Sequence, residues 1–233
     1  MSLIKKKRVL VAALICGVTF FAANVAQATP MVGSISTVQF GTGNSADNWI
    51  VDTIQVGQGT VEIAIKAKNR FIGDIIPTSG FVFQAEAGNP PVSGSNPTLV
   101  PGLTIWNFEW SAIFTGVDAA DFNVILGADF KPNDPDLANR FFFDVTAAPE
   151  LSPGVFQDSQ NLGFSFWQGL DPAIMPIDPF AAGTYQFSIE LVEVTGQSLS
   201  RIDMTVQVPE PGAVALFGLG LLGLVALRRR RTI

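Results

Sequence analysis

Three aspartates in the stretch DFKPNDPD, at positions Asp129, Asp134 and Asp136, place hard oxygen ligands within one short segment. Carboxylate oxygens are the ligands that calcium prefers in proteins. The spacing lacks the alternating ligands, the central glycine and the closing glutamate of an EF-hand loop, so a solvated turn of Asn, Asp and Pro is the alternative. Ligand type alone therefore predicts a calcium site here, and no other cofactor is predicted.

The sequence contains no histidine and a single cysteine, Cys16. Histidine bases, Ser-His-Asp triads and histidine metal sites are therefore excluded, and carboxylate pairs remain as the main enzyme chemistry. A glycoside hydrolase needs two carboxylates facing each other across a cleft, about 5 to 10 Å apart. The sequence identifies no such pair among its acids, and we predict no catalytic residue.

Exposed aromatic side chains are the platforms on which proteins stack sugars, and they are the second kind of candidate site. Trp106 and Trp110 alternate with polar residues and share a face with Phe108, as expected of an inward stripe of a strand. Trp49 and Trp167 show less clear alternation, so these two stay open as surface stacks. The full set of candidates is Trp49, Trp106, Trp110, Trp167 and Tyr185.

Residues 29–207 must supply the scaffold for any such site, and their pattern favours β-strands. Val61, Ile63 and Ile65 share one face of VEIAIKAK, with Glu62, Lys66 and Lys68 on the other. Two late segments alternate in the same way across a Gly-Gln turn and predict a hairpin. We therefore expect one all-β domain, an antiparallel β-sandwich with a jelly-roll or immunoglobulin-like topology. The late apolar stripes are Tyr185, Phe187, Ile189 and Leu191, then Ile202, Met204, Val206 and Val208.

The N-terminal residues 1–28 resemble a secretory signal peptide. MSLIKKKR supplies cations, a long apolar run follows, and the small residues Ala26 and Ala28 suit cleavage by signal peptidase after Ala28. An uncleaved membrane anchor is the alternative. Cys16 lies inside the apolar run after the bulky Ile15, which argues against lipidation, so the exported chain has no cysteine.

Residues 208–233 form a second distinct terminal segment. The run 213–227 carries no charge and predicts a short transmembrane helix of about 22 Å, at about 1.5 Å per residue. The basic cluster that follows, Arg228, Arg229, Arg230 and Arg231, predicts a stop-transfer signal on the cytoplasmic side. Pro209 and Pro211 break any helix that runs in from the domain, so Glu210 is expected in an extended, accessible hinge.

This order of hinge, apolar helix and arginine cluster resembles the PEP-CTERM sorting signal of Gram-negative bacteria, with Pro209, Glu210 and Pro211 as its Pro-Glu-Pro motif. The resemblance implies processing by an exosortase, a membrane enzyme. It also implies an exported protein of the cell envelope or exterior, anchored transiently in the inner membrane, commonly in bacteria that make exopolysaccharide and biofilm. The segment DPFAAGTY at 178–185 is similar to a turn in the bodies of some such proteins, which generally have no assigned activity.

The net charge of residues 29–207 limits the kinds of molecule that they can bind. These residues carry six Lys and Arg against nineteen Asp and Glu, a net charge of −13. Nucleic acid and anionic membrane surfaces would be repelled. The leading hypothesis is a non-enzymatic exported surface or extracellular-matrix protein. The alternatives are a carbohydrate-binding module retained in exopolysaccharide and, third, a carboxylate-dependent glycoside hydrolase.

Overall fold

The alternating pattern folds into two β-sheets in the computed structural model, which describes residues 29–41, 44–90, 102–134, 140–164, 167, 177–210 and 212. In this part of the chain the regular elements are strands and two short 3-10 helices, η1 (Ala119–Asp121) and η3 (Val145–Ala147). The described residues include no helix that is long and apolar enough to cross a membrane. The predicted signal peptide at 1–28 and the predicted transmembrane helix at 213–227 lie outside the described residues.

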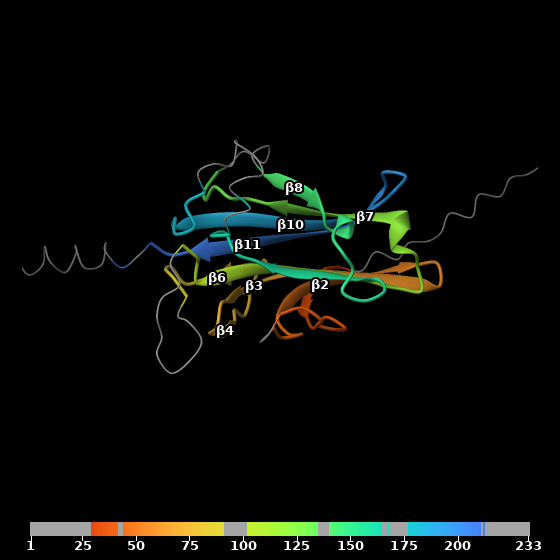
Figure 1. Ribbon diagram of the computed structural model, residues 1–233, viewed down its shortest axis with the longest axis horizontal. Coiled ribbons are helices and arrows are strands. Elements are labelled where there is room, and N and C mark those ends of the chain that lie inside the picture. Colours follow the sequence, from red (N-terminus) through yellow and green to blue (C-terminus); the bar gives the residue numbers. More distant parts are fainter. Residues whose placement is uncertain are drawn as a thin grey trace, which may run out of the picture.

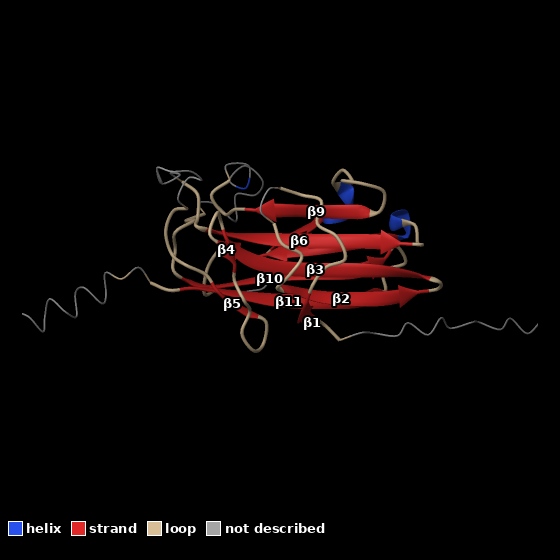
Figure 2. Ribbon diagram, turned by 90° about the horizontal axis from the view of Figure 1, so that it is seen from below, coloured by secondary structure: helices blue, strands red, loops and turns tan. Residues whose placement is uncertain are grey.

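One sheet has six strands in the order β1-β2-β3-β6-β9, with β4 paired to the end of β3 (Figure 2). The other has five strands in the order β5-β11-β10-β7-β8. The strands of the first sheet are β1 (Met31–Gly33), β2 (Trp49–Val56), β3 (Gly59–Asn69), β4 (Gly73–Asp74), β6 (Trp106–Thr115) and β9 (Val155–Gln160). Those of the second are β5 (Val82–Gln84), β7 (Phe122–Ala128), β8 (Phe141–Asp144), β10 (Gly183–Glu193) and β11 (Ser198–Val208).

The predicted late hairpin is confirmed as the antiparallel pair β10 and β11, in which Gly183 lies opposite Val208 and Ile189 opposite Ile202. The prediction of a wholly antiparallel arrangement was wrong at one edge, because β5 pairs with β11 in parallel. β5 can pair in parallel because residues 85–197 separate it from β11 in the chain, whereas two strands joined by a hairpin turn must be antiparallel. The all-β prediction is confirmed, and the jelly-roll or immunoglobulin-like topology stays a prediction.

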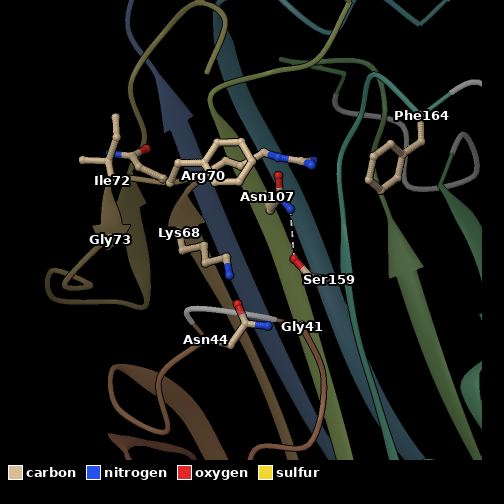
Figure 3. Close-up of a pocket in the computed structure, with 11 residues that line it drawn as sticks. Gly41, Asn44, Lys68, Arg70, Ile72, Gly73, Asn107, Ser159 and Phe164 are labelled. Carbon is tan, nitrogen blue, oxygen red and sulfur yellow. Dashed lines mark hydrogen bonds between the residues drawn. The ribbon is translucent and has the colours of Figure 1, made fainter. Parts of the chain in front are cut away.

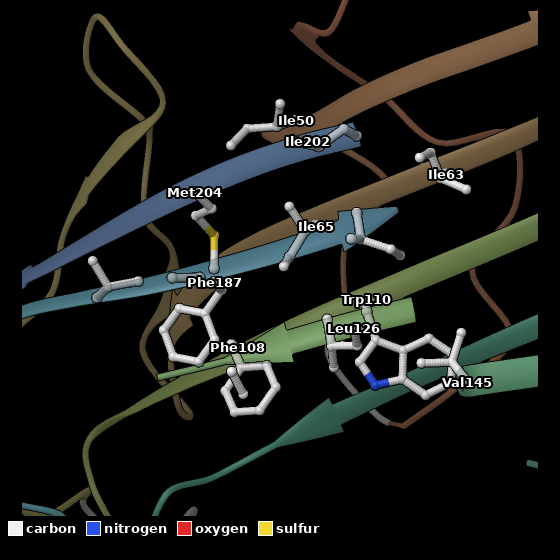
Figure 4. Close-up of a cluster of buried hydrophobic side chains, with 14 of the residues drawn as sticks. Ile50, Ile63, Ile65, Phe108, Trp110, Leu126, Val145, Phe187, Ile202 and Met204 are labelled. Atoms are coloured by element: carbon white, nitrogen blue, oxygen red, sulfur yellow. The ribbon is translucent and has the colours of Figure 1, made fainter. Parts of the chain in front are cut away.

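The core lies between the two sheets, which face each other in Figure 1. Phe108 on β6 stacks against Phe187 on β10 with ring centroids 4.6 Å apart, and Trp106 meets Tyr185 edge to face at 5.3 Å. Figure 4 shows Ile63, Ile65, Trp110 and Leu126 in the same cluster. Burial of these rings and aliphatic chains contributes most of the driving force for packing the sheets together.

The outer face of the six-stranded sheet is also covered, which the alternating pattern did not predict. The segment 34–48 crosses this face, and Ile35 and Phe40 pack there with Trp49, Val51 and Ala64 in a second buried cluster. Polar contacts fix the segment to the strands below it: the Ser36 N–H donates to the Glu62 carboxylate, and the Gln39 N–H to the side chain of Gln157. The polar side chains beneath this segment are therefore removed from solvent.

Gly59 gives a testable case of close backbone approach at the start of β3. A Cβ at this position would lie 2.4 Å from the Thr115 carbonyl oxygen and 2.7 Å from that of Gly116. Because both obstacles are backbone atoms, we expect Gly59→Ala to destabilise the protein by about 1–3 kcal/mol. Urea unfolding of the full chain would measure this. Gly33→Ala is the matched control, since its Cβ meets nothing within 4 Å, and an equal loss in both variants would contradict the explanation.

Candidate functional site

The predicted hinge follows directly from the last buried residue of the domain. Val208 is 5% exposed and ends β11, whereas Pro209 and Glu210 are exposed. Glu210 is therefore accessible, and its role in sorting, like that of Pro209, stays a prediction. Pro211, the four arginines Arg228 to Arg231 and the signal-peptidase residues Ala26 and Ala28 lie outside the described residues, and their roles stay predictions.

The predicted calcium ligands are only partly described, because Asp136 lies outside the described residues. Asp129 is 4% exposed, and its carboxylate accepts a hydrogen bond of 2.9 Å from the Lys131 N–H. Burial raises the pKa of Asp129, against the opposing effect of its backbone hydrogen bonds. Among the described residues no group of three or more acidic, histidine or cysteine side chains is placed to hold a metal ion. The calcium site stays a prediction.

The aromatic candidates for sugar stacking are buried. Trp49 is 0% exposed and belongs to the cluster under segment 34–48, and Trp167 is 2% exposed within the main core. The suggestion that these two form surface stacks was therefore wrong, because core packing and the covering segment enclose them. Trp106 and Trp110 point inward as predicted, and the Tyr185 hydroxyl donates to the Ala181 carbonyl inside the DPFAAGTY turn.

A buried charge cluster, consisting of Lys66, Lys68, Asp74 and Glu109, lies on the covered outer face. Glu109 is 0% exposed, with its carboxylate oxygens 2.6 Å from the Lys68 ammonium and 3.7 Å from that of Lys66. Lys66 is also 0% exposed, and it donates 2.9 Å to Asp74 and 3.0 Å to the Ser45 carbonyl. Two cations and two anions thus balance each other beneath segment 34–48.

The protonation of Asp74 makes the stability of the fold depend on pH in the acidic range. Burial alone would raise the pKa of Asp74, but the hydrogen bond and charge of Lys66, helped by Ser45 and Asn48, outweigh it and lower the pKa below its ordinary value. A carboxyl with a lowered folded-state pKa stabilises the fold above its unfolded pKa of about 4, and this contribution is lost as the pH falls.

We therefore predict that Asp74→Asn destabilises the protein most near neutral pH and that the difference from the natural protein shrinks below about pH 4. Urea unfolding of both proteins between pH 7 and pH 3 would measure this difference. A difference that stays constant over the whole range would contradict the electrostatic explanation.

A hollow of about 680 Å³, here called the Arg70 hollow, opens beside the cluster where β3 ends and β6 begins (Figure 3). The Asn107 side chain donates 2.9 Å to the Ser159 hydroxyl and accepts 2.7 Å from Asn161, which fixes the orientation of its amide. Six of the side chains that line the hollow are Asn44, Lys68, Arg70, Phe71, Asn107 and Phe164.

The Arg70 guanidinium differs from the neighbouring cations in its partners. No carboxylate of the described residues lies within 4.0 Å of it, whereas Lys66 and Lys68 are both paired. It lies 4.9 Å from the Phe71 ring centroid and 5.8 Å from that of Phe164. Burial without a compensating acid lowers the pKa of Arg70, which nevertheless stays a cation in proteins.

The hollow and the hinge lie at the same end of the domain. β3 and β11 both end there in Figure 1. Hydrogen bonds of the two residues that follow β5 connect these ends. The Asn69 side chain donates 3.3 Å to Glu86, and the adjacent Ala85 N–H donates 2.9 Å to the Gln207 carbonyl, one residue before β11 ends. Sequence reasoning missed this hollow, although two cations at alternate positions near the end of β3, Lys66 and Lys68, and a third directly after it, Arg70, were a usable signal.

Comparison with known protein families matches residues 207–231 to the PEP-CTERM protein-sorting motif. The chain therefore carries this motif, which implies processing by an exosortase, a membrane enzyme, and an exported protein that is transiently anchored in the membrane. No curated protein matches the chain. Among solved structures it is similar to the PmoD soluble domain from Methylocystis sp. ATCC 49242 (Rockwell), with 12% identity and a TM-score of 0.31 over 67% of this chain and 97% of that one.

Proposed function

We propose that this chain is a non-enzymatic, exported surface or extracellular-matrix protein that an exosortase sorts through its C-terminal motif. The match at 207–231 supports the sorting step. The match begins at Gln207, within the last two residues of β11, so the sorting signal adjoins the folded domain directly.

The observation that carries the proposal is the position of the hinge relative to the core. Val208 is buried and pairs with Gly183, and every described residue of the main core cluster lies at or before Val208. Cleavage within the exposed hinge would therefore remove the predicted helix and arginines without opening the core. The product would be a complete two-sheet domain, as a surface or matrix component requires.

The test is the intact mass of the protein recovered from the envelope and the medium of its native cells, with and without the exosortase. We expect loss of residues 1–28 in both strains, and loss of the segment after the hinge only when the exosortase is present. A tail retained in both strains would mean a simple C-terminal anchor, and the sorting proposal would fail.

The absence of catalysis is part of the proposal and draws support from the two hollows described. None of the described residues that line the Arg70 hollow is an acid. A second hollow, of about 400 Å³, contains Asp118, Asp144 and Glu150. The carboxylates of Asp118 and Asp144 accept backbone N–H bonds that cap η1 and η3, which leaves Glu150 as the one described acid of this hollow without such a role, whereas a glycoside hydrolase needs two. Carboxylates held in capping roles are poorly placed as the acid and base of a glycoside hydrolase.

Binding of a polysaccharide is the second candidate function, and the Arg70 hollow is the observation that favours it. The hollow combines an exposed aromatic ring, Phe71, with amide and hydroxyl groups from Asn107 and Ser159. Rings that contact the apolar face of a sugar, and amides that bond its hydroxyls, are the usual parts of a saccharide site. This candidate would retain the sorted protein in exopolysaccharide.

A further inference from the structure

We infer that the Arg70 hollow binds a single sugar that carries a carboxylate, such as a uronic acid residue within an otherwise neutral polysaccharide, because the net charge of −13 on residues 29–207 would repel a polyanion. The inference rests on the second candidate function and specifies its ligand. It starts from Arg70, a cation that lines the hollow and has no carboxylate within 4.0 Å among the described residues.

Arg70 is an exception in an acidic domain. Residues 29–207 hold about three acids for each cation, and Lys66, Lys68, Arg140 and Arg201 each lie within 4.0 Å of a carboxylate. Among the described residues, only Lys131 and Arg70 have no carboxylate that close, and only Arg70 lines the hollow. In the part of the chain that the structure describes, no carboxylate lies that close to Arg70, which faces a hollow without acids. A planar guanidinium in such a place has the geometry to accept a carboxylate through two parallel hydrogen bonds.

Phe71 adds a second, independent feature beside Arg70. Its side chain is 54% exposed, and its backbone has a φ of 64°, a conformation that bulky residues rarely adopt. Strain of this kind costs about 1–3 kcal/mol and persists where the surrounding structure imposes it, often at ligand sites. Here it holds an exposed ring at the rim of the hollow, within 4.9 Å of the Arg70 guanidinium.

Asn107 and Ser159 give the hollow a polar lining that is fixed in position. Asn107 is 5% exposed, and its amide is held by hydrogen bonds with Ser159 and Asn161. An ordered amide and hydroxyl offer donors and acceptors to sugar hydroxyls with little loss of side-chain entropy on binding. A ligand that satisfies all three walls carries a carboxylate for Arg70, an apolar face for Phe71 and hydroxyls for Asn107 and Ser159.

The experiment measures binding of two oligosaccharides of equal length to the full chain in mild detergent. An oligogalactose that ends in a single galacturonate is the acidic probe, and oligogalactose is its neutral counterpart. We expect the acidic oligomer to bind about 10- to 100-fold more tightly, the usual strength of a charge-assisted hydrogen-bonded pair. We expect Arg70→Gln to abolish this preference and Arg201→Gln, a cation on the other sheet, to keep it.

Arg70→Lys provides a second variant should Arg70→Gln fail to fold. It keeps the charge but loses the planar fork, so we expect the preference to fall without disappearing. Equal binding of both oligomers would overturn carboxylate recognition while leaving polysaccharide binding in place. Binding of neither oligomer would overturn both. Binding to vesicles of anionic phospholipid in place of either sugar, with loss in Arg70→Gln, would overturn the inference in favour of a membrane surface.

Discussion

Replacing Glu109 by glutamine is expected to lower the free energy of unfolding by about 3–5 kcal/mol, the cost of breaking a buried ion pair from one side. Glu109 is 0% exposed and lies against two ammonium groups, those of Lys66 and Lys68. Glutamine has the same shape, so the change removes charge without leaving a cavity. Lys68 then loses its carboxylate partner, and Lys66 keeps Asp74 and the backbone carbonyls of Ser45 and Asp47.

Denaturant unfolding of the full chain, followed by tryptophan fluorescence and by circular dichroism, would measure this effect. Arg201→Gln is the matched control, because Arg201 pairs with Asp203 and Glu190 at the surface and exposed pairs contribute about 0–1 kcal/mol. The loss in Glu109→Gln should also change little with added salt, since buried charges are weakly screened. A loss similar to that of the control would show that solvent reaches the cluster.

The alternating sequence pattern of β3 did not predict that the charge cluster of Lys66, Lys68, Asp74 and Glu109 is buried. Alternation correctly placed Val61, Ile63 and Ile65 on one face of β3 and Lys66 and Lys68 on the other. Period-two patterning assigns side chains to faces, but it does not tell whether a polar face meets water. Segment 34–48 covers that face, and its apolar residues are spaced without a strand or helix period.

The two candidate sites, the sorting motif and the Arg70 hollow, differ in how far the sequence could predict them. The sorting motif is contiguous, so residue order alone was enough to predict it, and the hairpin before it fixed where the hinge begins. The Arg70 hollow gathers side chains from segment 34–48, β3, β6, β9 and the stretch after β9. Long-range strand pairing determines which of these segments meet, and a single sequence carries no direct record of that pairing.

Replacing Pro209, Glu210 and Pro211 by alanine is expected to block maturation almost completely while leaving export intact. Export depends on the predicted signal peptide at residues 1–28, which the change does not touch. Alanines remove the carboxylate at the exposed hinge and allow helix to continue where proline forbids it. The domain should fold normally, because its core closes at Val208. We therefore expect a full-length, tail-bearing form without residues 1–28 to accumulate in the membrane fraction.

Intact mass and membrane fractionation of the native cells would establish this outcome. The chain supplies its own matched control, since Pro149 and Glu150 form an exposed Pro-Glu pair within the domain. Pro149→Ala with Glu150→Ala should mature at the normal rate, because recognition depends on the hinge and its adjoining tail rather than on any accessible Pro-Glu pair. Normal maturation of the triple-alanine variant would refute the role of the motif, whereas slow maturation of both variants would point to a folding defect instead.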